Sequence, residues 1–142
     1  METKQIELVK HSWSLVAPIA DTAATLFYGN LFTMDPSLKY MFKEDMTAQK
    51  KTLMATLGYV VAKLDKLEDI VGEVMKLGAR HASYGVKESH YHTVGAALLL
   101  TLEQGLGDNW NNDVKEAWVA AYTILSGAMI QAQQQAESVL SA

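Results

Sequence analysis

Four side chains of this sequence could together hold and serve a metal cofactor. His81 ends a helical stretch and offers an imidazole nitrogen, which is a good ligand for iron. Phe42 follows a turn that contains Pro36 and offers a flat aromatic ring. Tyr28 lies 14 residues before Phe42 and Gln49 lies seven after it, and both can donate a hydrogen bond to a small ligand. An iron porphyrin needs these groups: one axial nitrogen, a wedging ring, an apolar slot and few polar groups on the ligand side.

Each of these residues also has an ordinary structural explanation. A lone histidine near a helix end can simply cap main-chain carbonyls, and a phenylalanine most often packs in a core. Tyr28 could be half-buried between two helices, and Gln49, followed by Lys50 and Lys51, would suit a solvated helix face. Taken singly the residues leave their roles open, and their combination favours a cofactor pocket.

The composition is that of a globular protein. A chain of 142 residues predicts one domain, residues 1–142, with a real core. The net charge of −4 argues against a nucleic-acid partner, and the absence of cysteine excludes disulfides and thiolate-ligated metals. The first residues lack the apolar core of a signal peptide, and no apolar run approaches the ~20 residues of a membrane span. We therefore expect a cytoplasmic protein without a membrane partner.

Helical periodicity predicts an all-α chain. Ile6, Val9, Trp13 and Val16 form one apolar stripe, and Pro18 marks a break or a new first turn. Seven unequal helices are expected, at about 6–16, 19–33, 35–42, 53–64, 68–83, 88–106 and 112–140, with a turn at 105–109. Such helices can pack at steep angles and leave a pocket between them.

The order and spacing of Tyr28, Pro36, Phe42, Gln49 and His81 resemble those of a globin. More narrowly, the chain resembles bacterial single-domain globins and the haem domain of flavohaemoglobins. The segment 78–81, followed by 84–86, looks like the proximal segment of bacterial globins. The resemblance extends from residue 6 to residue 136 and implies a single globin domain that binds haem b.

The resemblance also implies a role for individual residues. His81 is the implied axial ligand, Phe42 stacks on the porphyrin, and Tyr28 and Gln49 form a distal pair. Ferrous iron gives electron density to a dioxygen ligand, and hydrogen bonds to a charged acceptor are the stronger kind. Further cofactor contacts are implied for Leu53, which closes the distal roof, and for Leu57, Leu77, Arg80, Val86, Tyr91 and Val94.

One position departs from the family pattern. Tyr91 matches a tyrosine that flavohaemoglobins place near the proximal imidazole, and in that family a glutamate on the last helix completes the hydrogen-bonded set. Gln133 stands at the matching position here. An amide does not accept a hydrogen bond as strongly as a carboxylate, so we expect His81 to be an ordinary neutral ligand.

The resemblance implies a haem protein that binds dioxygen, nitric oxide or carbon monoxide opposite His81, of the oxygen-binding, storage or transport type. The alternatives are a nitric oxide dioxygenase that takes electrons from a separate reductase, a gas or redox sensor, and a helical domain without cofactor. A zinc site of His81, His90 and His92 is a further alternative, but spacings of nine and two are not a recognised zinc pattern.

Overall fold

The computed structural model describes the backbone of residues 1–83 and 87–141, and the side chains of these residues except 81–83, 88 and 135–141. Within these ranges every regular element is helical, which confirms the all-α fold. The α-helices are α1 (Thr3–Val16), α2 (Ala20–Met34), α3 (Thr47–Ala62), α4 (Val71–Ser83), α5 (Glu88–Leu106) and α6 (Asn112–Ser141). Within the same ranges, four short 3-10 helices lie between α-helices: η1 (Ala17–Ile19), η2 (Pro36–Met41), η3 (Leu64–Asp69) and η4 (Gly107–Asn109). In the part of the chain so described, no helix is both long and apolar enough to cross a membrane.

Aspartate side chains lie just before two of the elements, and one of them is a cap. Asp35 accepts a hydrogen bond from the main-chain N–H of Ser37 at 3.1 Å, so η2 begins at the predicted cap. Helix α3 has Met46 at its N-cap, without a capping side chain, and begins at residue 47, six residues before the first apolar position of the expected helix. Asp45, just before this N-cap, accepts a hydrogen bond from the N–H of Thr47 at 3.0 Å. The apolar pattern of residues 47–52 is weak, so apolar spacing alone placed the start of this helix too late.

The expected helix at 68–83 is shorter in the structure. Residues 64–69 form η3, in which Lys66 leaves the helical region at φ −140° and ψ 49°, and α4 begins at Val71. Pro18, by contrast, produces only the 3-10 turn η1 between α1 and α2. The break at Pro18 was expected, whereas η3 shortens the helix expected at 68–83 at its N-terminal end.

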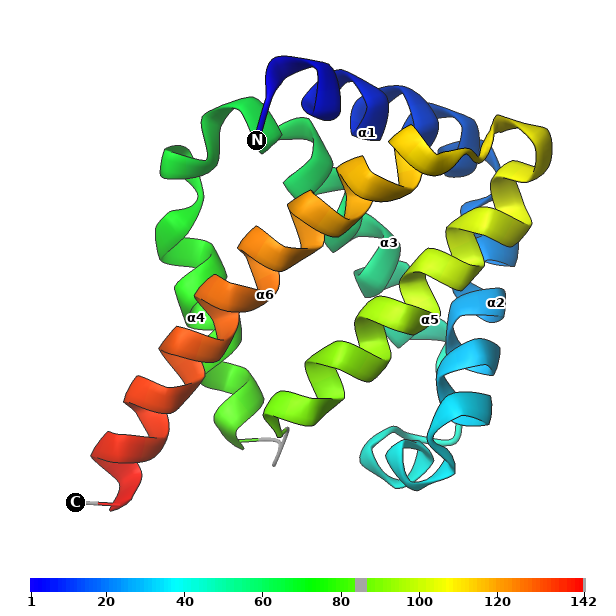
Figure 1. Cartoon of the computed structure of the whole chain (residues 1–142). Helices are drawn as coiled ribbons and strands as arrows, with labels where there is room; N and C mark the ends of the chain where they lie inside the picture. The colour runs from blue at the N-terminus through cyan, green and yellow to red at the C-terminus, as the bar shows by residue number, and fades with distance from the viewer. Residues whose placement is uncertain (84–86, 142) are drawn as a thin grey trace.

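The long helix α6 crosses the molecule and packs along α1 with its first half and along α4 with its second half (Figure 1). Helix α5 lies beside α2. A buried hydrogen bond joins α1 and α6: the indole N–H of Trp118 donates to the hydroxyl of Ser12 at 2.8 Å. Ser12 in turn donates to the carbonyl of Leu8 at 2.7 Å, so the polar groups in this part of the core are satisfied.

Helices α4 and α6 approach closely at Gly78. A Cβ atom at this position would lie 2.5 Å from the carbonyl oxygen of Met129, 2.9 Å from its Cα and 3.1 Å from the Cβ of Ala132. Main-chain atoms cannot move aside as a flexible side chain does, so glycine is required here for space. The contact fixes the position of α4, which carries residue 81 near its C-terminal end.

Candidate functional site

The two predicted distal residues are brought together by α2 and α3. Tyr28 is 4% exposed on α2, and the amide Nε2 of Gln49 donates a hydrogen bond to its phenol oxygen at 3.1 Å. This bond uses a lone pair of the Tyr28 oxygen and not its proton. Burial raises the pKa of the Tyr28 phenol above its ordinary value of 10.0, and the hydrogen bond from Gln49 offsets this in part. Tyr28 is therefore neutral and can act as a donor at neutral pH.

Phe42 completes an aromatic cluster with Tyr28. Its ring lies at the end of η2, half-buried, with its centroid 5.5 Å from that of Tyr28 in an edge-to-face arrangement. Phe32, which the sequence analysis did not select, stands 5.6 Å from Phe42 and 6.0 Å from Tyr28. The ring centroid of Phe27 lies 5.0 Å from that of Tyr28, also edge-to-face. The cluster holds the phenol and the proposed stacking ring in fixed relation.

Five of the residues predicted to contact a cofactor share one property. They are apolar, pack against the core, and keep part of their surface uncovered: Phe42, Leu53, Leu57, Leu77 and Val94. They come from the end of η2 and from α3, α4 and α5. Partly uncovered apolar side chains of this kind suit contact with a flat, largely apolar group.

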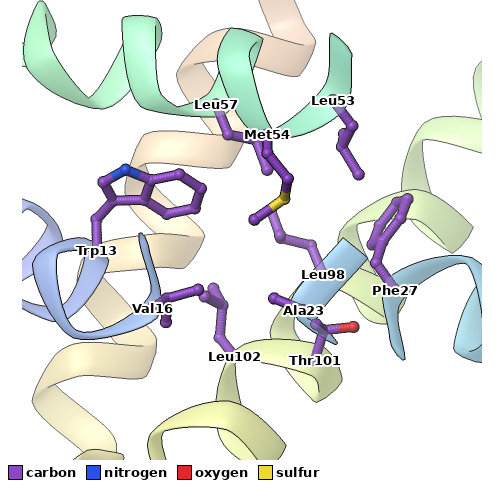
Figure 2. Close-up of a pocket in the computed structure, with 10 residues that line it drawn as sticks. All are labelled: Trp13, Val16, Ala23, Phe27, Leu53, Met54, Leu57, Leu98, Thr101 and Leu102. Carbon is purple, nitrogen blue, oxygen red and sulfur yellow. The ribbon is translucent and has the colours of Figure 1, made fainter. Parts of the chain in front are cut away.

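A small cavity lies between α1, α2, α3 and α5 (Figure 2). Leu53 and Leu57 face it from α3, together with Met54, and Phe27 faces it from α2. Its volume is about 10 Å³, far too small for a porphyrin. The hydroxyl of Thr101 at its edge donates to the carbonyl of Ala97 at 2.7 Å, so its proton is already committed. The cavity is therefore an apolar space beside two of the predicted pocket residues.

The proximal side is described in part. The backbone of His81 belongs to α4, as predicted, but its side chain lies outside the described residues, and so does Val86. Arg80 is exposed on α4, and Leu77 is half-buried one turn before His81. The role of His81 as an axial ligand stays a prediction.

Tyr91 and Gln133 form the predicted contact. The hydroxyl of Tyr91 donates to Oε1 of Gln133 at 2.7 Å, and the two residues are 6% and 4% exposed. The residues come from α5 and α6 and are 42 positions apart. A buried amide needs such a partner, and Gln133 thus serves as the neutral acceptor that the sequence analysis expected.

His90 has a structural function at the start of α5. Its Nδ1 accepts a hydrogen bond from the main-chain N–H of Lys87 at 2.9 Å, which satisfies one of the donors at this end of the helix. His92 is exposed. Among the side chains that the structure describes, no group of three or more histidine and carboxylate side chains could hold a metal ion.

Tyr122 and Gly95 were missed by the sequence analysis. The hydroxyl of Tyr122 donates to the main-chain carbonyl of Tyr91 at 2.6 Å, and its ring lies against Gly95. One signal was available: Tyr122 precedes Gln133 by eleven residues, which is close to three helical turns and places both on one side of α6. A tyrosine at that interval from a residue already selected could have been identified.

The two buried phenols should make the fold sensitive to high pH. Burial is the main cause that raises the folded-state pKa of Tyr122, as it is for Tyr28, whereas both phenols ionise near 10.0 in the unfolded chain. The stability that neutral phenols contribute is thus present below pH 10 and is lost as the pH rises above it. We therefore expect both phenols to lose their protons only as the protein unfolds. In an alkaline titration, ultraviolet absorbance follows the phenolates and circular dichroism follows the loss of helix. Tyr28→Phe and Tyr122→Phe should each remove one phenolate from that step, and ionisation of both before unfolding would contradict the expectation.

Comparisons with known proteins agree with the helical fold described above. The family model described as Globin matches residues 25–129. The flavohemoprotein of Bacillus subtilis is 31% identical over 96% of this chain, which spans 37% of the length of that relative. The chain thus spans little more than a third of the length of that relative.

Two solved structures share the fold. A bacterial globin from Campylobacter jejuni superposes with a TM-score of 0.81 at 26% identity, over 96% of this chain and 99% of the other. An engineered carbene transferase from Rhodothermus marinus superposes with a TM-score of 0.90 over 100% and 99% of the two chains, and at 21% identity this likeness concerns the fold. The match of the family model over most of the chain, together with the helical architecture, shows that this chain belongs to the globin family, whose members are haem proteins.

Proposed function

We propose that this protein binds dioxygen reversibly at a haem b held by His81, in one globin domain comprising residues 1–142. The observation that carries the proposal is the hydrogen bond from Gln49 to Tyr28, which brings two potential donors together beside Phe42. Nitric oxide and carbon monoxide would use the same site. The cysteine-free chain suits the reducing cytoplasm, where we propose that it acts in oxygen binding, storage or transport.

The described residues fit a haem. Phe42, Leu53, Leu57, Leu77 and Val94 offer partly uncovered apolar surface from four elements, which a macrocycle would cover. Arg80 is exposed on the proximal helix and would suit a carboxylate at the rim of the group. Val86 is proposed as a further contact from the sequence resemblance alone. Tyr91, buried beside Gln133, would face the proximal imidazole.

When bound, the haem supplies a ferrous iron that coordinates a diatomic gas and shifts electron density onto it. The protein's contribution is to orient donors and to exclude water. Tyr28 keeps its proton because burial raises its pKa, and its oxygen is held in place by Gln49. Gln49 is exposed, whereas Tyr28 is fixed in the core, so the two donors approach the proposed ligand from the surface and from the interior.

Removing the Tyr28 hydroxyl should speed dioxygen release. A hydrogen bond to a charged acceptor contributes about 1.5–3 kcal/mol, and about 1.4 kcal/mol is a factor of ten. We therefore expect dioxygen to dissociate at least about tenfold faster from Tyr28→Phe, and carbon monoxide to respond much less because it carries less charge. Stopped-flow dissociation of both gases measures this, with Phe32→Leu as a control for packing. Equal acceleration of the two gases would mean that Tyr28 acts through its shape.

A second candidate function is nitric oxide dioxygenation. One dioxygen and one nitric oxide, with one electron, give nitrate, so turnover requires an electron donor. The similarity to flavohemoproteins, which are about three times as long, favours this candidate. A separate reductase could supply the electron that turnover needs. Dioxygen held by Tyr28 and Gln49 would be the reactant in both functions. Steady nitrate formation with an added reductase would support the second candidate, and a single turnover that then stops would support reversible binding.

The optical spectrum of the purified protein tests the proposal. We expect a haem absorption band in the ferric and ferrous forms, a mainly five-coordinate ferrous form, and a shift to a six-coordinate form with carbon monoxide. Neutral glutamine at position 49 is a poor iron ligand, which is why the sixth position should be vacant without gas. A protein that purifies without haem and does not take it up would overturn the proposed function.

A further inference from the structure

The segment that joins α2 to α3 is positively charged in a protein that is negatively charged as a whole. Residues 39–51 form a basic corner, with four of the twelve basic residues of the chain and two acidic ones, while the net charge of the chain is −4. Residues 88–142 carry one lysine and six acidic residues. In Figure 1, η2 lies at the lower end of α2, whereas the turn between α5 and α6 lies at the upper edge. The positive and negative regions are thus separated in space.

The lysines of the basic corner are available to a partner. Lys39, Lys43 and Lys51 are exposed, and none of them forms an ion pair with a side chain that the structure describes. Asp45, one of the two acidic residues, accepts hydrogen bonds from the N–H and the hydroxyl of Thr47 at 3.0 and 2.8 Å. An acidic surface could therefore pair with these lysines without first breaking an ion pair inside the protein.

Apolar side chains are exposed between two of these lysines. Tyr40 is 92% exposed, which is the highest exposed fraction among the large apolar residues that the structure describes, and Met41 is 42% exposed. Lys39 precedes this pair and Lys43 follows it closely. Tyrosine and methionine are enriched in protein interfaces, where an apolar centre is surrounded by a polar rim. The basic corner therefore has the composition of a small protein-docking surface.

The basic corner also borders the proposed cofactor pocket. Phe42, the proposed stacking ring, lies between Met41 and Lys43 in the chain and is half-buried, with its centroid 5.5 Å from that of Tyr28. A partner seated on Tyr40 and Met41 would thus lie next to a side chain that contacts the porphyrin. Because electron transfer slows steeply with the separation of donor and acceptor, this position gives a short route to the iron.

We propose that the basic corner is the docking surface for an acidic protein that donates single electrons to the haem. The inference rests on the proposed function, in which the chain holds a haem, and on the electron that turnover of nitric oxide would need. One electron leaves the reduced cofactor of the donor and converts ferric iron to ferrous iron, and no bond is made or broken. Opposite charges would steer the donor to this surface and raise the rate of association.

Reduction of the ferric haem protein by reduced flavodoxin, a small acidic flavin protein, tests the proposal. We expect the second-order rate constant to fall as salt is added, because ions screen the exposed charges. Lys39→Glu/Lys43→Glu should lower this rate constant at least about tenfold at low salt and remove most of its salt dependence. Haem content and the binding of carbon monoxide, a neutral ligand, should stay unchanged.

A second pair of lysines provides the matched control. Lys4 on α1 and Lys115 on α6 are both exposed, so Lys4→Glu/Lys115→Glu alters the net charge by the same amount far from the corner. This control should be reduced within about twofold of the wild-type rate. Equal losses of rate in the two double variants would show that net charge alone governs the reaction, and would overturn the proposal.

Nuclear magnetic resonance of the carbon monoxide complex locates the surface without electron transfer. Oxidised flavodoxin should shift the amide signals of residues 39–51, and Tyr40→Ser should weaken its binding at least about threefold. Shifts confined to residues 88–142 would overturn the proposal. So would shifts of residues 39–51 that depend only on protein concentration, which would assign the surface to a second copy. Shifts caused by phosphatidylglycerol vesicles and not by flavodoxin would assign it to a membrane and would also overturn the proposal.

Failure of the docking surface can be told apart from failure of the proposed function. A protein that purifies without haem and does not take it up refutes the proposed function. A haem-replete protein that binds dioxygen, but whose reduction by flavodoxin does not depend on Lys39 and Lys43, refutes the docking surface alone.

Discussion

Replacement of His81 by alanine should remove most of the haem from the purified protein. The pocket proposed here supplies one strong axial nitrogen, while its other contacts, apart from Arg80 at the rim, are mainly apolar and hold the porphyrin by packing. Loss of the nitrogen should abolish or greatly weaken the haem absorption band. Added imidazole should restore it in part, because a free ligand can occupy the space left by the side chain.

Two histidine variants serve as controls for this result. His92 is exposed on α5 and His11 is exposed on α1, so His92→Ala and His11→Ala should keep the wild-type spectrum. Haem content per protein, measured by absorbance, compares all three variants. A His81→Ala protein with an unchanged spectrum would remove His81 from the axial position and direct attention to His90, whose Nδ1 already accepts a hydrogen bond from Lys87.

Alanine at position 78 should destabilise the protein strongly although alanine favours helices. The added Cβ would meet the carbonyl oxygen of Met129 at 2.5 Å and its Cα at 2.9 Å, so α4 and α6 would have to separate. Overpacking of this kind typically costs about 1–3 kcal/mol, and more where the backbone must move. Because α4 carries Leu77 and His81, the same displacement should increase the rate of haem loss.

The same helix offers a matched control. Gly72 also belongs to α4, but an added Cβ there meets nothing within 4 Å. Gly72→Ala should therefore stabilise the protein, by up to about 1 kcal/mol, through helix propensity. Chemical denaturation with urea measures both variants. Similar stabilities for Gly72→Ala and Gly78→Ala would show that the close approach of the two helices relaxes at little cost.

The elements of the fold could be predicted where local chemistry decides them. Asp35 and Pro36 define the start of η2, and Gly107, with φ at 53°, lies in the turn expected at 105–109. The start of α3 at Thr47 was not predicted, because the expectation relied on apolar spacing, and residues 47–52 carry little of it. The start of α4 was placed three residues early, since residues 68–70 fit a helical pattern and the kink at Lys66 depends on packing.

In the candidate site, the sequence analysis predicted two contacts between residues that are remote in sequence. Tyr28 and Gln49 meet across α2 and α3, and Tyr91 meets Gln133 across α5 and α6, as the resemblance implied. Tyr122 was not predicted, because its importance arises from the space above Gly95 and not from its own sequence context. A contact that depends on the mutual approach of two helices is visible only once their packing is known.

The buried bond between Ser12 and Trp118 has a consequence for how the chain is made. These residues are 106 positions apart, and at about 5–20 residues per second a ribosome needs roughly 5–20 s to synthesise that interval. Isolated helices form within about a microsecond, so α1 is present long before the helix that covers it. Its inward face, with Val9 and Val16, is meanwhile open to solvent or to other nascent chains. We therefore expect a chain released before α6 to aggregate, and the N-terminal segment to be a natural point of contact for chaperones during synthesis.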